Sequence, residues 1–186
     1  MCVRFPFNDR KTAQAAAYLL HLAGGELNYM QLIKLMYLAD RQMLLEHGLP
    51  ITGDRMVSMK HGPVLSRILD FINEGDGPNN PSAWFEYIGP AKNYSVALLK
   101  DPGTDELSKF ELGLLKNIYE TYGRMDKWKL VRMLHEILPE WKDPGSSMHP
   151  IEPEDILRAA SRSEAEIREI QDAADDFRFL STSSTR

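Results

Sequence analysis

The chain has 186 residues, of which 43% are hydrophobic, so it is long enough to bury the core of one domain. Its 22 basic and 27 acidic residues give a net charge of −5, which argues against a dedicated nucleic-acid binder and suits a basic partner better. The single cysteine, Cys2, allows no internal disulfide, and no run approaches the roughly 20 apolar residues of a membrane span, so we expect a cytoplasmic protein without membrane insertion.

Two helices are predicted at the start of the chain. Asn8 or Asp9 can cap the first helix, because their side chains accept hydrogen bonds from free backbone N–H groups, and the glycines at 24–25 would end it. Asn28 opens a variant of the capping box before a longer second helix, which Gly48 closes. This second helix is expected to be the core helix.

Asp40 in the second helix is expected to point into the core, since on an ideal helix it lies opposite Gln31 and Lys34. A buried carboxylate is costly unless it is hydrogen-bonded, and the N–H groups of a helix start at residues 62–63 are natural partners. We therefore interpret Asp40 as a structural anchor and Arg41 as a solvated charge. The alternative is that the two form a functional pair.

A short extended segment is predicted over residues 51–61, where Gly53 precedes an apolar run. Pro63 then suits the first position of a third helix, because its missing N–H would have no partner there anyway, and Gly75 would end that helix.

A β-hairpin is predicted next, since residues 84–88 and 94–99 are β-prone and flank a turn-rich segment. A two-stranded element can shield only one of its faces, so Trp84, Phe85 and Tyr87 are expected to be exposed. These aromatic side chains are candidate anchors for a protein partner.

Three further helices follow. Ser108 begins a capping box, and Asp126 can cap a helix that Pro139 stops. Pro153 precedes a short helix around Ile156. The fold class is therefore mainly α (α+β), a compact helical domain with a small β element over residues 1–160.

The C-terminal region, residues 161–186, is expected to be a separate part. Residues 161–177 are rich in acidic side chains with sparse apolar spacing, which predicts an acidic helix, and residues 181–186 are expected to be disordered.

The candidate chemical sites are weak. His135 lacks the second histidine one turn later that a zinc protease needs, because position 139 is proline, so we expect it to pack with Trp141 and predict no metal or cofactor site. His61 could bind an anion or donate to Asp40, but as a catalytic base it lacks a visible nucleophile. A hydrolase using Asp40, His61 and His135 remains an alternative.

A DNA-binding regulator is a further alternative, since a helical chain could contain a helix-turn-helix. The small basic patch of Lys127, Lys129 and Arg132 is more typical of a solvated helix face than of a recognition helix.

Several segments form a series of motifs along the chain. Residues 32–41 read L-I-K-L-M-Y-L-A-D-R, residues 50–54 read P-I-T-G-D, and residues 61–64 read H-G-P-V. Together with His135 and Trp141 and the Pro150 to Ile156 segment further downstream, this series resembles the Panacea, or SocA-like, antitoxin domain. The motif residues identified by this resemblance are Tyr37, Asp40, Arg41, His61, Gly62, Pro63, Val64, His135 and Trp141.

The resemblance implies an antitoxin that binds and neutralises a cognate protein toxin encoded beside it, with no catalysis and no cofactor. One branch of the family acts as a proteolytic adaptor that delivers its toxin to the ClpXP protease, so that mode stays open. The family commonly has an aromatic residue before Gly-Pro-Val, where this chain has His61.

Overall fold

The computed structural model describes residues 3–77 and 81–183, with side chains up to residue 180. Its helices are α1 (Asp9–Leu22), α2 (Tyr29–His47), α3 (Ser66–Glu74), α4 (Trp84–Tyr87), α5 (Lys109–Tyr122), α6 (Lys127–Ile137), α7 (Pro153–Ala159) and α8 (Glu164–Ser183). Its strands are β1 (Glu26–Asn28), β2 (Met56–Met59), β3 (Gly62–Leu65), β4 (Ser95–Ala97) and β5 (His149–Ile151). The predicted mainly helical α+β class is confirmed.

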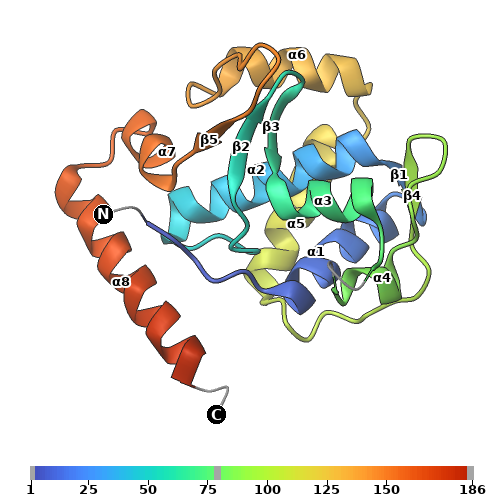
Figure 1. The fold of residues 1–186 in the computed structure, drawn as a ribbon, viewed down its shortest axis with the longest axis horizontal. Coiled ribbons are helices and arrows are strands. Elements are labelled where there is room, and N and C mark those ends of the chain that lie inside the picture. The colour runs from blue at the N-terminus through green and yellow to red at the C-terminus, as the bar shows by residue number, and fades with distance from the viewer. Residues whose placement is uncertain (1–2, 78–80, 184–186) are drawn as a thin grey trace.

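The strands form two small antiparallel sheets. Strand β1 pairs with β4, and β2 lies between β3 and β5. Figure 1 shows α2 running through the centre of the molecule behind the β2–β3 pair, with α6 above them. Helix α2 contacts α1, α3, α5, α6 and α7 as well as β3, so it is covered on nearly all sides.

Local capping signals placed the helix ends correctly. The side chain of Asn28 accepts from Met30 N at 3.0 Å, and Gly48 ends α2 in the left-handed conformation. Asn8 caps α1, Asp126 caps α6, and Ser108 forms the predicted capping box at α5.

The prediction that Pro63 starts the third helix is wrong. Pro63 lies in β3, an edge strand, where the absence of an N–H donor is tolerated. Helix α3 begins at Ser66, and its free N–H groups are capped from a distance by Asp54, whose carboxylate accepts from Arg67 N at 3.0 Å and Ile68 N at 3.1 Å.

The predicted β-hairpin over residues 84–99 is also wrong in its first arm. Residues 84–87 form the short helix α4, and β4 pairs with β1. The two predicted arms keep only an isolated antiparallel bridge between Ile88 and Leu98. Trp84 is only 1% exposed, and its ring lies 5.7 Å from that of Phe71, so its predicted exposure is wrong. Phe85 and Tyr87 are half-buried. Burial against α1 and α3 outweighs the β propensity of this run.

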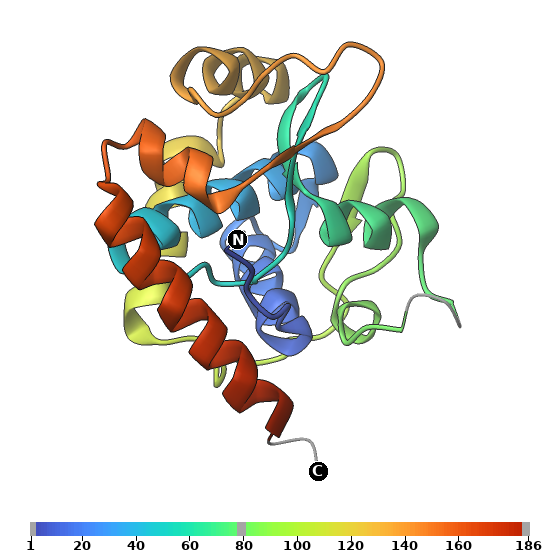
Figure 2. The same ribbon diagram turned by 60° about the vertical axis from the view of Figure 1, so that its left-hand side comes forward.

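The acidic C-terminal helix is longer than predicted. Helix α8 continues to Ser183, so the prediction of disorder is wrong for residues 181–183, and residues 184–186 lie outside the described part of the chain. Ile167 and Ala174 are buried on one stripe of α8, and Ile170 packs over Gly48. Figure 2 shows α8 lying along one side of the molecule. Among the helices described, none has the length and apolar character needed to cross a bilayer.

Gly53 lies where the N-terminal segment crosses the loop after α2. Its replacement by alanine tests how closely these two segments pack. Its φ is +70°, and a Cβ there would overlap Pro6 O. Gly145 has a similar φ of +63° but open space around it. We expect Gly53→Ala to lower the free energy of unfolding by at least about 2 kcal/mol more than Gly145→Ala, because steric overlap adds to backbone strain. Equal losses in urea denaturation would contradict this packing.

Candidate functional site

Among the motif residues, Asp40 is fully buried, with 0% of its surface exposed to solvent. Its Oδ1 accepts from Ile51 N and Thr52 N, each at 3.0 Å, and its Oδ2 accepts from the Thr52 hydroxyl. Burial raises the pKa of Asp40 to about 7, against the opposing effect of these hydrogen bonds. The predicted buried anchor is confirmed, but its partners are in the loop after α2 and not at residues 62–63.

The same loop connects Asp40 to the start of α3. The Thr52 hydroxyl accepts from Asp54 N at 3.0 Å, which fixes Asp54 close to the N–H groups that it caps. Burial raises the pKa of Asp54, whereas the backbone donors of Arg67 and Ile68 lower it. A chain of polar contacts therefore runs from α2 through the loop to α3.

Lys34 lies on the opposite side of α2 and is also buried, at 1% exposed. On an ideal helix Lys34 lies opposite the side that was expected to face the core. In the structure, the β2–β3 pair covers this face of α2. Its Nζ donates to Pro63 O at 2.9 Å, and a Cβ at Gly62 would lie 3.1 Å from Nζ. Burial lowers the pKa of Lys34 to about 7.

Arg41 is an ion-pair partner, so its predicted solvation is wrong. Its Nε donates to Glu140 Oε1 at 2.6 Å and its Nη2 to Oε2 at 3.2 Å, while the Tyr37 hydroxyl donates to Oε1 at 2.8 Å. Burial and the Glu140 charge raise the pKa of Tyr37. Glu140 was missed from the sequence, although Tyr37 and Arg41, one helical turn apart, could have indicated a shared acceptor.

The predicted packing of His135 with Trp141 is confirmed. Their rings stack with centroids 3.7 Å apart and 7° between planes, and Trp141 Nε1 donates to Met59 O at 3.0 Å. Burial and the nearby Lys34 charge lower the pKa of His135. Its Nε2 is buried and has no hydrogen-bond partner in the described part of the chain.

His61 lies apart from Asp40. It is exposed in the turn between β2 and β3, and its ring meets Trp128 edge-on at 5.3 Å. Within residues 3–77 and 81–183, no group of three His, Cys, Asp or Glu side chains is placed to hold a metal ion. The charge of His61 also lowers the pKa of His135, so these two imidazoles lie near each other. The hydrogen bonds of Asp40 go to Ile51 and Thr52 instead, so the structure does not bring the three together as one site.

A cleft of about 840 Å³ lies elsewhere, between the N-terminal segment, β2, α3 and β5. Asp54 and Arg67 line it, whereas Asp40, His61 and His135 do not. Its wall includes both signs of charge, and the Arg67 guanidinium lies 4.9 Å from the centre of the Phe7 ring.

A family model described as Antitoxin SocA-like, Panacea domain, matches residues 32–142, which is more than half of the chain, and the protein belongs to this family. The matched segment runs from α2 to the residue after Trp141, so it includes all nine motif residues. No curated protein and no solved structure matches the chain.

Removal of the buried carboxylate tests the anchor. Asp40→Ala leaves the N–H groups of Ile51 and Thr52 without their acceptor, so we expect the free energy of unfolding to fall by about 3 kcal/mol or more. Asp101→Ala is the control, because Asp101 accepts from Gly103 N in an exposed turn. Equal losses for the two variants in urea denaturation would show that Asp40 is not an anchor.

Lys34 predicts a pH dependence of stability. Its pKa is about 7 in the folded state and 10.5 in the unfolded chain, so between these values the unfolded state binds the extra proton. Stability therefore rises with pH in this window, by up to about 1.4 kcal/mol per pH unit from this group. We expect Lys34→Met to remove that rise between pH 7 and 9, whereas exposed Lys60→Met keeps it. If the stability of Lys34→Met rose with pH as steeply as that of the wild type, this would contradict the burial of Lys34 as a neutral amine.

Proposed function

We propose that this protein is the antitoxin of a toxin–antitoxin system and neutralises a cognate protein toxin by direct contact in the cytoplasm. Membership of the Panacea family supports a toxin–antitoxin role. The observation that carries the proposal is that the polar motif side chains hold the scaffold together, which leaves the outer surface to bind a partner.

The burial of the motif residues supports binding over catalysis. A catalytic acid or base must reach a substrate, but Asp40 and Lys34 are enclosed, and Glu140 is occupied by Tyr37 and Arg41. His61 is exposed but has Trp128 as its ring neighbour. We therefore propose a protein without enzymatic activity, and the hydrolase reading has no assembled site to support it.

Two of the aromatic anchors predicted from the sequence remain candidates for toxin contact. Phe85 and Tyr87 are half-buried on α4, so part of each ring can meet a partner. Trp84 beside them is enclosed, and its place against Phe71 makes it a support for α4.

A second candidate function is the adaptor that presents its bound toxin to the ClpXP protease. Helix α8 favours it, because this helix is acidic and its end carries three exposed apolar side chains. Phe177, Phe179 and Leu180 are 51%, 71% and 63% exposed. We propose that residues 161–186 form this additional contact surface on the toxin-binding part, residues 1–160.

The adaptor mode can be separated from direct neutralisation by shortening α8. Truncation after Asp176 removes the exposed apolar end but keeps Ile167 and Ala174, which are buried. In an adaptor, we expect the half-life of the toxin in cells to lengthen with the truncated chain, while complex formation is retained. An unchanged half-life would argue against delivery to a protease.

Co-expression with the protein encoded beside this chain tests the proposed function. We expect the wild-type chain to restore growth and to co-purify with that protein, because neutralisation is by contact. His61→Ala should lose growth only where it also loses the complex, since no catalytic step is proposed for it. Growth restored without a complex, or growth lost in a His61→Ala form that still binds, would contradict neutralisation by binding.

A further inference from the structure

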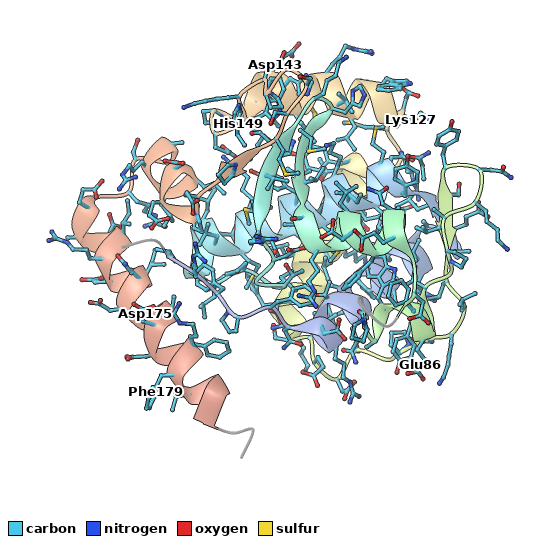
Figure 3. The ribbon with its side chains drawn as sticks, viewed as in Figure 1. Glu86, Lys127, Asp143, His149, Asp175 and Phe179 are labelled. Atoms are coloured by element: carbon cyan, nitrogen blue, oxygen red, sulfur yellow. The ribbon has the colours of Figure 1, made fainter. Side chains whose placement is uncertain are left out.

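Two exposed aromatic rings and a cation meet where α6 begins. Lys127 Nζ lies 5.5 Å from the centre of the Tyr94 ring and 5.7 Å from that of Trp128, and His61 meets Trp128 from the β2–β3 turn. Tyr94 and Trp128 are 68% and 43% exposed. Figure 3 shows Lys127 at the start of α6, on the side where the loop before β4 rises beside it. We call these four residues the cation–aromatic surface.

Tyr94 combines a strained backbone with an exposed ring. Asn93 and Tyr94 have φ of 50° and 64°, a region that glycine adopts at lower cost than a bulky residue. The turn is held by paired hydrogen bonds between Lys92 and Ser95, at 2.8 and 2.9 Å, and by Tyr29 N donating to Tyr94 O at 3.0 Å. The Tyr94 ring is exposed, so its burial does not compensate for the free energy of this strained conformation. Backbone strain of this kind is found most often at functional sites.

The segments of the chain that carry the cation–aromatic surface have a net positive charge, opposite to that of the whole chain. Residues 60–61, 92–94 and 124–132 carry five exposed cations besides Lys127, namely Lys60, Lys92, Arg124, Lys129 and Arg132. Asp126 is the single carboxylate in these three segments, and its Oδ1 already accepts from Trp128 N and Lys129 N at 3.0 Å. A positive surface with exposed rings therefore stands out on a chain of net charge −5.

We infer that the cation–aromatic surface binds an acidic segment of the toxin, with Lys127 pairing with a carboxylate and the Tyr94 and Trp128 rings packing against the apolar atoms beside it. This inference rests on the proposed antitoxin function. Tryptophan, tyrosine and charged pairs are the usual strong contacts of protein interfaces. A protein occupant fits better than nucleic acid, because nucleic-acid affinity comes mainly from neutralising many phosphates, which a chain of net charge −5 opposes, whereas a protein segment also gains from apolar contact with the two rings.

The chain offers a matched control at the start of α5. Lys109 and Phe110 occupy the first two positions after the cap Ser108, as Lys127 and Trp128 do after Asp126. Phe110 is 49% exposed, and His47 meets it edge-on at 4.4 Å, much as His61 meets Trp128. The control therefore has the same local chemistry without the strained turn and the surrounding cations.

The experiment measures the binding of the purified protein encoded beside this chain to six full-length forms by titration calorimetry. These are the wild type, Trp128→Ala, Lys127→Glu, Tyr94→Asn, Phe110→Ala and Lys109→Glu. We expect Trp128→Ala and Lys127→Glu to raise Kd by about tenfold or more, and the α5 variants to change it by about twofold or less. Equal thermal unfolding of the variants is required, and Tyr94→Asn removes the second ring with a residue that tolerates positive φ.

The outcomes separate this inference from the proposed function. If the wild type neither binds nor restores growth, the proposed function fails. If the wild type binds and the α6 variants bind equally well, the inference is overturned and the function stands. Restoration of Lys127→Glu binding by a carboxylate-to-lysine change in the toxin would support the acidic segment. Loss of RNA retention in the α6 variants, with toxin binding unchanged, would overturn it in favour of nucleic acid.

Discussion

The buried Asp40 carboxylate accepts three hydrogen bonds, and the rest of the fold depends on this constraint. It fixes residues 51–52 directly after the central helix, and Thr52 in turn places Asp54 at the start of α3. The position of α3 and of β2 therefore follows from one side chain of α2. A buried acceptor of this kind stabilises the structure only while all its donors are present, which makes the loop and the helix mutually dependent.

The buried polar residues also divide the protein into a scaffold and an outer surface. Lys34 attaches α2 to the β2–β3 pair, and Glu140 attaches α2 to the segment after α6 through Tyr37 and Arg41. These contacts use the polar groups of the side chains that hold the central helix in place. What distinguishes one member of such a family from another is then expected at the exposed turns and helix starts, where a change does not break the scaffold.

The elements that the sequence predicted well depend on local chemistry. The caps at Asn28 and Ser108 need only neighbouring backbone groups, so their positions could be inferred without knowledge of the fold. Pro63 and Trp84 were misplaced because strand pairing and core packing with distant residues decide their conformation. The Glu140 ion pair joins residues 99 positions apart and therefore has no local signal. The cation–aromatic surface joins two turns and the start of α6, so the sequence indicated only its basic patch and not the rings that meet it.

The division into scaffold and binding surface can be measured most directly by amide hydrogen exchange, comparing the chain alone with the chain bound to the protein encoded beside it. We expect binding to slow exchange over residues 92–94 and 124–132, while the amides of Ile51 and Thr52, already hydrogen-bonded to Asp40, exchange at the same slow rate in both states. Unchanged exchange over residues 92–94 and 124–132, or faster exchange at Ile51 and Thr52 on binding, would contradict this division.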